Sequence, residues 1–167
     1  MKKILFISLI AVGTLSSCLK QDNKCNYVDS TIVAPAEQQA ALKDSLTAHG
    51  ITDVTLHPSG FYYTIVNQGS GPSVVNLCSN ITVDYVGSFL NGKVFDSTTT
   101  GASAYFALGQ VIPGWQKAIP LINKGGDINL YIPPALAYGS RDFPSTGTVV
   151  IPGGSNLVFK IHIANIQ

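Results

Sequence analysis

The sequence predicts an α+β fold in which an antiparallel sheet packs on one short helix. After residue 50, short segments rich in β-branched and aromatic residues alternate with glycine- and proline-containing turns, which is the pattern of successive strands. Asn91 and Gly92 lie between two such segments and form a strong hairpin signal, which indicates antiparallel pairing. One short helical stretch, residues 112–121 around Trp115, interrupts the strands and has to cover one face of the sheet.

The composition limits the classes of protein that fit. A length of 167 residues suits one domain with extensions. Hydrophobic residues make up 46% of the chain, which is enough for a core, whereas charged residues make up 11%, against about 25% in a typical soluble domain. The net charge is +1, and Lys2 and Lys3 lie in a segment that we expect to be removed. No basic patch remains elsewhere, which argues against nucleic acid as a partner.

Residues 1–17 have the layout of an export signal. Lys2 and Lys3 form a basic start, residues 4–15 are almost wholly apolar, and two serines supply the small residues that a signal peptidase requires. This apolar run is shorter than the about 20 residues that span a bilayer, so a retained transmembrane helix is the weaker interpretation.

The end of this signal contains a cysteine at a special position. Residues 15–18 (LSSC) resemble a bacterial lipobox, and the resemblance implies that Cys18 becomes the new N-terminus and carries lipid. The alternative is plain secretion with Cys18 left as an ordinary thiol. Each buried methylene of an acyl chain contributes about 0.8 kcal/mol, so several chains hold a protein firmly to a membrane. We therefore expect a lipid-anchored protein of the cell envelope, on the periplasmic side or at the cell surface.

The two other cysteines form an even pair. Cys25 and Cys78 remain once Cys18 is acylated, and an even pair in an exported protein favours a disulfide. The alternative is two unpaired thiols, because Cys25 lies in a segment that reads as a tether.

Two segments precede the predicted domain. Residues 18–34 are polar and mixed and read as a lipidated tether, and residues 35–56 form a helical extension with Pro35 in the first turn. Leu42 and Leu46 are four residues apart and share one face of this helix. The helix either docks on the domain or contacts a second copy or a client protein, and the single apolar pair favours docking.

The remaining residues, 57–167, carry the strands. Alternation is clearest where Ile81, Val83 and Tyr85 share one face of a strand, and the last strand alternates in the same way. The predicted strands cover residues 61–66, 81–86, 93–96, 127–132 and 157–166.

Four blocks of this domain resemble the signatures of FKBP-type peptidyl-prolyl cis/trans isomerases, in the family's order and at similar spacing. The blocks are residues 83–87 (VDYVG) with 91–97 (NGKVFDS), 106–115 (FALGQVIPGW), 132–134 (IPP) with 137–139 (AYG), and 151–152 (IP) with 156–159 (NLVF). The resemblance implies an antiparallel sheet of five to six strands wrapped around a short helix, with a shallow apolar pocket between them. It also implies a peptidyl-prolyl isomerase whose substrates are proline-containing, unfolded or partly folded exported proteins.

The resemblance assigns roles to ten residues of this chain. The implied catalytic residues are Tyr85, Asp96, Ile112 and Tyr138. The implied substrate-binding residues are Phe95, Phe106, Val111, Trp115, Ile151 and Phe159. Trp115 would form the pocket floor, Ile112 would offer its backbone N–H to a substrate carbonyl, and Tyr138 would offer its hydroxyl. Taken singly, each aromatic residue also reads as ordinary core.

These residue types fit the chemistry of amide rotation. The barrier to rotation is about 18–20 kcal/mol because conjugation must be broken, whereas the two X–Pro isomers differ by only about 0.5–1 kcal/mol. No bond is made or cut, so no nucleophile is required. The twisted amide is less polar than the planar one, and a dry aromatic pocket with a few fixed donors favours it. Stabilisation by about 5 kcal/mol would accelerate the step several thousandfold.

Other kinds of catalytic site find little support. The histidines have no spacing that suggests metal ligation, and the cysteines form no CxxC pair, so we expect neither a metal nor a cofactor. The alternatives that stay open are a non-catalytic FKBP-like binding module or holdase chaperone, and an accessory lipoprotein of another membrane complex.

Three departures from the family pattern bear on the pocket. Ala104 stands where many members carry an aromatic ring, and Gln110 replaces an acidic residue found in some members. The segment 140–150 is longer than in the smallest members, and its Phe143 either supplies a substitute apolar contact or shields the pocket. The contact at position 110 is mainly a backbone carbonyl, so little loss is expected from Gln110. Together the changes put the catalytic rate and the substrate preference in doubt, and Ala104 and the altered segment do the same for the binding of the family's macrolide ligands.

Overall fold

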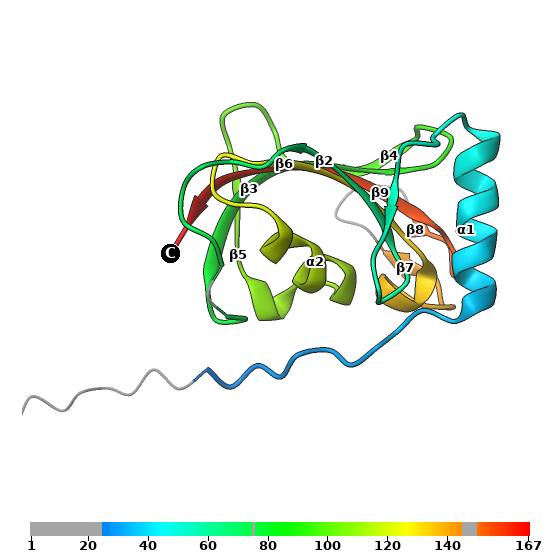
Figure 1. The fold of residues 1–167 in the computed structure, drawn as a ribbon, viewed down its shortest axis with the longest axis horizontal. Helices are drawn as coiled ribbons and strands as arrows, with labels where there is room; N and C mark the ends of the chain where they lie inside the picture. Colours follow the sequence, from blue (N-terminus) through cyan, green and yellow to red (C-terminus); the bar gives the residue numbers. More distant parts are fainter. Residues whose placement is uncertain (1–24, 75, 145–149) are drawn as a thin grey trace, which may run out of the picture.

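The computed structural model describes residues 25–74, 76–144 and 150–167. Its main feature is a seven-stranded antiparallel sheet in the order β1-β2-β6-β9-β3-β4, with β5 also paired to β3 (Figure 1). The strands are β1 (Thr55–Leu56), β2 (Tyr62–Asn67), β3 (Asn80–Phe89), β4 (Val94–Ser97), β5 (Ala104–Ala107), β6 (Asp127–Ile132) and β9 (Leu157–Ile166). The α+β class predicted from the sequence is confirmed, and the short strands β1 and β5 enlarge the expected sheet of five to six strands.

The helical elements are short except for the first. They are α1 (Ala36–Ala48), α2 (Pro113–Ala118) and the 3-10 turns η1 (Leu108–Gln110), η2 (Ile119–Leu121) and η3 (Pro134–Leu136). A separate two-stranded hairpin pairs β7 (Phe143–Pro144) with β8 (Val150–Ile151). The single helical stretch expected over residues 112–121 is therefore α2 followed directly by η2.

The sheet curves around α2, and the core lies between them (Figure 1). Because strand side chains alternate between faces, every second residue of β9, from Leu157 to Ile163, points to the concave side and is buried. Ile128, Leu130 and Ile132 of β6 do the same one strand away. Trp115 fills the centre of this layer from α2 and is only 4% exposed.

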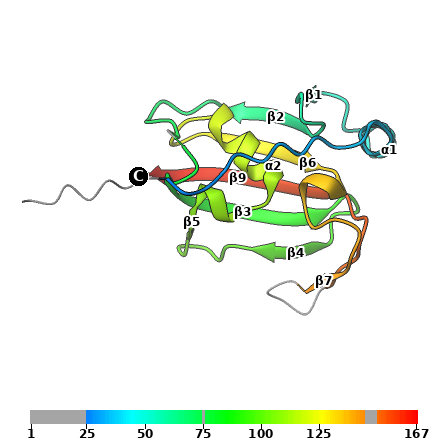
Figure 2. The same ribbon diagram turned by 90° about the horizontal axis from the view of Figure 1, so that it is seen from below.

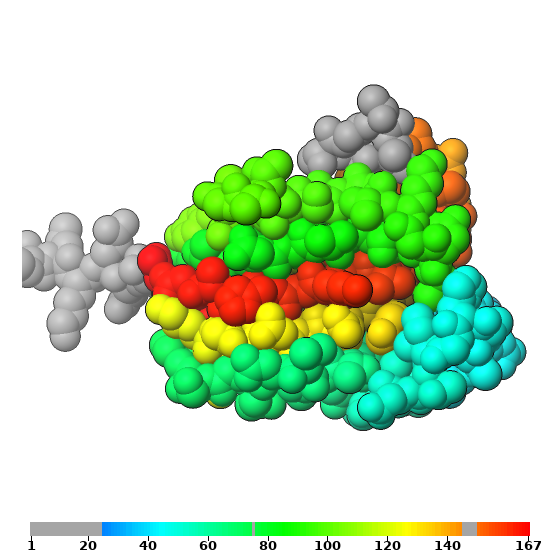
Figure 3. Space-filling view, turned by 90° about the horizontal axis from the view of Figure 1, so that it is seen from above, coloured from blue at the N-terminus to red at the C-terminus, as the bar shows by residue number. Residues whose placement is uncertain are grey.

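Helix α1 covers one end of the opposite, outer face of the sheet. Figure 3 shows it in cyan at one corner of that face. Leu42 and Leu46 are fully buried there against Tyr62, Tyr131 and Val158, which are outward-pointing residues of β2, β6 and β9. The domain itself thus occupies the apolar side of the helix, as the docking interpretation expected.

Leu46→Ala is expected to lower the free energy of unfolding by about 3 kcal/mol, because it leaves a cavity between α1 and the sheet. Asp44 is an exposed residue of the same helix and provides a control, since Asp44→Ala should not lower the stability by more than about 0.5 kcal/mol. Urea unfolding followed by circular dichroism measures both. Equal losses from the two substitutions would show that α1 does not rest on Leu46.

The N-terminal strap, residues 25–34, lies against the domain on the α2 side (Figure 2). A disulfide joins Cys25 to Cys78, and the Lys117 ammonium donates a hydrogen bond to the Ser30 carbonyl. Tyr27 packs so closely on Gly109 that a Cβ at Gly109 would lie 2.2 Å from the ring. The part of the expected tether that the structure describes is therefore fastened to the domain.

The signal segment 1–17 and Cys18 lie outside the described residues. Within residues 25–74, 76–144 and 150–167, no helix has the length and apolar character that crossing a membrane requires.

Candidate active site

A cavity of about 320 Å³ opens beside α2 on the concave side of the sheet. Aromatic and aliphatic side chains form most of its lining, and one carboxylate joins them. The lining residues are Tyr85, Asp96, Phe106, Gln110, Val111, Ile112, Trp115, Tyr138 and Phe159. Eight of the ten residues that the family resemblance assigned to a pocket thus come together in one place, from segments far apart in the sequence.

Trp115 forms the floor of this cavity. Its ring meets the rings of Tyr85 and Phe159 edge to face, with centroids 5.3 and 5.2 Å away, and the Phe106 ring at 6.4 Å. Edge-to-face contacts are a favoured arrangement of aromatic rings and hold the indole in one orientation. Its Nε1–H is buried and has no hydrogen-bond partner among the described residues. A buried unpaired donor costs about 1–3 kcal/mol, which is a cost typical of a functional site.

Asp96 and Tyr85 form the polar centre of the wall. The Tyr85 hydroxyl donates to Oδ2 of Asp96 at 2.5 Å. The β3–β4 hairpin brings them together, since its register pairs Asp96 with Gly87 and the connecting turn uses Gly92 at φ 84°. Gly87 is needed here because a Cβ would lie 2.8 Å from Phe95 ring atoms. The β3–β4 hairpin, which the sequence predicts from Asn91 and Gly92, thus places the Asp96 carboxylate in the lining of an apolar cavity.

The electrostatics keep the two phenols of the site protonated. Burial, and then the hydrogen bond to Asp96, raises the pKa of Tyr85 well above its ordinary value. Burial, and then the negative charge of Asp96, raises the pKa of Tyr138 as well. A phenol of ordinary pKa is already protonated at neutral pH, so these shifts keep both hydroxyls as hydrogen-bond donors further into the alkaline range.

The raised pKa of Tyr85 predicts a loss of stability at alkaline pH. The unfolded chain ionises this phenol near pH 10.0, whereas the folded protein keeps the proton to higher pH. The contribution is fully present below pH 10 and is lost as the pH rises towards the folded-state pKa. We expect the free energy of unfolding to fall above pH 10 and Tyr85→Phe to reduce that fall. Urea unfolding at a series of pH values measures it, and an unchanged slope in the variant would refute the assignment.

The segment before α2 supplies Gln110, Val111 and Ile112 to the lining. Gln116 holds it by donating from Nε2 to the carbonyls of Val111, at 2.8 Å, and Gly109, at 3.3 Å. Ile112 is the residue that precedes the helix, and its carbonyl accepts the backbone N–H of Trp115. Ile112 is one of the residues that line the cavity.

Two assigned residues lie one layer behind the lining. Phe95 is 4% exposed and packs edge to face on Phe159 at 5.6 Å. Ile151 belongs to β8, is 2% exposed and is part of the main core cluster. Gln110 is the one lining residue without an assigned catalytic or binding role, and the signal for it is the family pattern, in which some members carry an acidic residue at this position.

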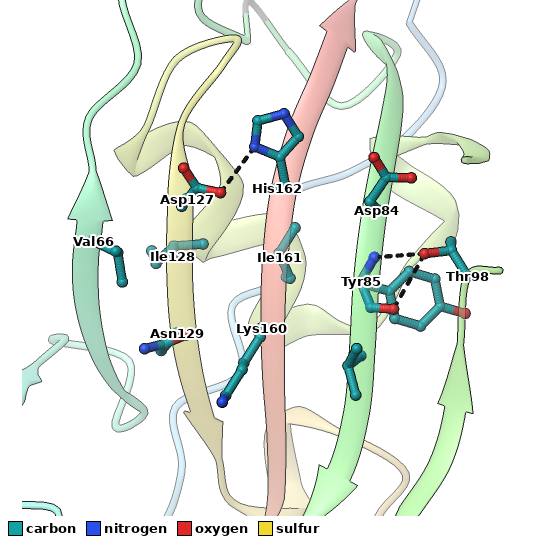
Figure 4. A pocket seen from close by; sticks show the side chains of 11 residues that line it. Val66, Asp84, Tyr85, Thr98, Asp127, Ile128, Asn129, Lys160, Ile161 and His162 are labelled. Carbon is teal, nitrogen blue, oxygen red and sulfur yellow. Dashed lines mark hydrogen bonds and ion pairs between the residues drawn. The ribbon is translucent and has the colours of Figure 1, made fainter. Parts of the chain in front are cut away.

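A second hollow lies on the outer face of the sheet (Figure 4). Its lining mixes polar side chains, such as Asp84, Asn129 and Lys160, with apolar ones. Nδ1 of His162 pairs there with Oδ1 of Asp127 at 2.9 Å. Tyr85 contributes from β3, where its backbone N–H donates to the Thr98 hydroxyl. Across the described residues, no three His, Cys, Asp or Glu side chains gather as a metal site. The cavity beside α2 is the better candidate for binding an apolar peptide, because aromatic and aliphatic side chains form most of its lining.

The antiparallel sheet on a short helix, with an aromatic cavity between them, defines a protein of the FKBP class. The family profile described as FKBP-type peptidyl-prolyl cis-trans isomerase matches residues 71–164, which is more than half of the chain. The chain belongs to this family, and the resemblance inferred from the four sequence blocks is confirmed.

Named relatives agree with this membership. The FKBP-type isomerase FkpA of Buchnera aphidicola subsp. Baizongia pistaciae is 44% identical over 153 residues, covering 89% of this chain and 59% of that protein. Outer membrane protein MIP of Legionella longbeachae is 37% identical over 115 residues, covering 68% and 47%. The crystal structure of FkpA from Escherichia coli superposes with a TM-score of 0.66 at 34% identity, covering 79% of this chain and 60% of that one. The chain spans about half the length of the two curated relatives.

Proposed function

We propose that the protein is a peptidyl-prolyl cis/trans isomerase that assists the folding of exported proteins. The observation that carries the proposal is the aromatic cavity with Trp115 as its floor and the Tyr85–Asp96 pair in its wall. Such a cavity fits a proline ring and excludes water from the amide that precedes it. Since rotation needs no nucleophile or metal, these side chains suffice for the reaction.

Some of these residues bind the proline ring, and others stabilise the twisted amide. The proline ring rests on Trp115, with Phe106 and Phe159 as walls, so the rotating bond lies in an apolar environment. The N–H of Ile112 holds a carbonyl of the substrate, and the Tyr138 hydroxyl supplies a second donor. Donors that are fixed before the substrate binds need no reorganisation as the amide twists. The charge of Asp96 acts beside these donors and orients Tyr85.

A refolding experiment separates this function from that of a holdase. A client protein whose refolding is limited by isomerisation of an X–Pro bond should refold faster when the isomerase is present at about one molecule per twenty client molecules. One isomerase molecule then acts on many clients in turn. A holdase would act only at about one chain per client and would slow recovery. Acceleration that needs stoichiometric amounts would contradict the isomerase and favour the binding module.

We propose further that Cys18 carries a lipid anchor in the cell envelope. The support is the LSSC sequence at residues 15–18, together with relatives named FkpA and outer membrane protein MIP. Six residues lie between Cys18 and Cys25, so the seven steps of the extended link reach at most about 25 Å. Because the strap and the disulfide fix Cys25 to the domain, this arrangement keeps the cavity close to the membrane.

Mass spectrometry and fractionation test the anchor. The protein extracted from membranes should begin at Cys18 and carry the mass of its acyl chains, and Cys18→Ser should move it to the soluble fraction. An unmodified Cys18 would leave plain secretion as the explanation.

The same cavity is proposed to accept macrolide ligands of the family. Its aromatic floor supports binding, whereas the small side chain of Ala104 in β5 leaves the adjoining wall thin. A macrolide that competes with a proline peptide for the cavity would support this ligand class, and a lack of competition at saturating concentration would exclude it.

A further inference from the structure

One hydrogen bond joins helix α1 to the turn that leads to Tyr138. Oε1 of Gln38 accepts the backbone N–H of Ala135 at 3.0 Å, although the two residues are 97 positions apart in the chain. Ala135 lies in η3, and Tyr138 follows three residues later and lines the aromatic cavity. Helix α1 precedes residues 71–164, which the family profile matches, so this contact comes from outside the matched segment.

The spacing of residues along α1 turns Gln38 towards the domain. Gln38, Leu42 and Leu46 follow one another at intervals of four residues and therefore share one face of the helix. Both leucines are fully buried against the sheet. On the next residue, Nε2 of Gln39 donates to the Ala34 carbonyl at 2.7 Å, which fastens the start of the helix to the strap. The position of the Gln38 amide is therefore fixed by the docking of the whole helix.

The turn requires an acceptor from another part of the chain. Its first two residues are Pro133, at the N-cap position, and Pro134, and neither has an N–H or a side-chain acceptor. Three later N–H groups of the turn donate to the carbonyls of these two prolines. The first N–H groups of a helical turn have no carbonyl partner within it, and here the first N–H is that of Ala135. Gln38 thus gives Ala135 the hydrogen bond that an N-cap side chain usually supplies.

The geometry of this turn determines where Tyr138 lies. The N–H of Gly139 donates back to the Pro134 carbonyl at 2.9 Å, which closes the turn around Tyr138. Leu136 is fully buried and holds the middle of the turn in the core, whereas Gln38 holds its start. The hydroxyl is at the far end of a long side chain, so a small rotation of the turn moves it by a larger amount.

We propose that Gln38 is a positioning residue of the isomerase, which caps η3 from the helical extension and so holds the Tyr138 hydroxyl where it can donate to the substrate. The proposal rests on the isomerase function and makes α1 part of the working unit. Gln38 is not among the residues that line the cavity, so it acts through Tyr138.

The first test measures isomerisation of a peptide with Leu or Phe before proline. Gln38→Ala should lower kcat/KM by about three- to tenfold, and by no more than Tyr138→Phe does, because it removes one hydrogen bond that acts through that side chain. Gln38→Glu keeps an acceptor oxygen on a side chain of the same length and should restore most of the activity. Gln39→Ala is the matched control, because it removes a hydrogen bond of the same helical turn to the strap, and it should leave kcat/KM unchanged.

A double-mutant cycle separates positioning from a general loss of stability. In a Tyr138→Phe protein the hydroxyl is absent, so adding Gln38→Ala should lower kcat/KM little further. Gln38→Met keeps the length of the side chain and removes the acceptor, and it replaces the alanine variant in the cycle if that variant unfolds. Losses that multiply in the cycle, or a Gln38→Glu protein as slow as Gln38→Ala, would overturn the positioning role.

Failure of this role differs from failure of the isomerase function. An active wild-type protein whose Gln38 variants keep full kcat/KM would overturn the positioning role alone. A wild-type protein without activity on any peptide would refute the isomerase. The same cycle, measured as binding of the proline peptide through the fluorescence of Trp115, would then show whether Gln38 still acts through Tyr138.

Discussion

Replacing Asp96 with alanine is expected to lower kcat/KM for proline peptides by about 10- to 100-fold while the protein stays folded. The carboxylate accepts the Tyr85 hydroxyl at 2.5 Å and sets the electrostatic environment of Tyr138. Hydrogen bonds to charged groups contribute about 1.5–3 kcal/mol, which corresponds to this range of rates. A cis-to-trans assay on a short peptide measures the effect, and circular dichroism checks the fold.

Two matched variants identify what Asp96 contributes. Asp96→Asn keeps the shape and an acceptor oxygen and removes the charge, whereas Tyr85→Phe removes the donor and keeps the charge. If the charge matters most, Asp96→Asn should be nearly as slow as Asp96→Ala and Tyr85→Phe should be less affected. Full activity in Asp96→Ala would remove this residue from the site.

Loss of the Cys25–Cys78 disulfide is expected to have the largest effect on stability. The bridge closes a loop with a sequence separation of 53 residues, and constraining the unfolded chain over that length contributes about 4 kcal/mol. The doubly substituted Cys25→Ser, Cys78→Ser protein should therefore unfold at a markedly lower urea concentration. Equilibrium unfolding in urea, under oxidising conditions, gives the difference directly.

A strap variant separates the covalent link from the packing around it. Tyr27→Ala removes the ring that covers Gly109 and keeps the disulfide, so it should cost clearly less than the double substitution. Reductant should lower the stability of the wild-type protein and leave the double variant unchanged. A stability loss below about 1 kcal/mol in the double variant would contradict the predicted role of the bridge.

Regular alternation made the central strands predictable. The bounds of β6 and β9 match the residues expected from the sequence, because both strands have one face in the core. The two-residue strand β1 and the strand β5 were not expected, since segments this short carry little periodicity. The sequence favours the Cys25–Cys78 disulfide that fastens the strap, whereas the hydrogen bond from Lys117 to the strap joins residues too distant in the sequence to be predicted.

The site residues were predictable where the spacing of the family's sequence motifs identifies them. Motif positions identify residues that approach a pocket, but they do not separate a lining residue from one directly behind it, as Phe95 and Ile151 show. That distinction depends on the depth of packing, which follows from the three-dimensional arrangement of the strands. The stack of Phe143 on Tyr138 likewise depends on the path of the β7–β8 hairpin. The sequence alone allows two roles for Phe143, a substitute apolar contact or a shield of the pocket.

The most direct test is the cis-to-trans rate of a short peptide with Leu or Phe before proline, measured with the soluble form that begins at Leu19. Clear acceleration by the wild-type protein is expected, with a large loss in Asp96→Ala and a smaller loss in Tyr138→Phe. A folded protein that binds the peptide in the cavity and does not accelerate its isomerisation would contradict the isomerase and leave a binding module.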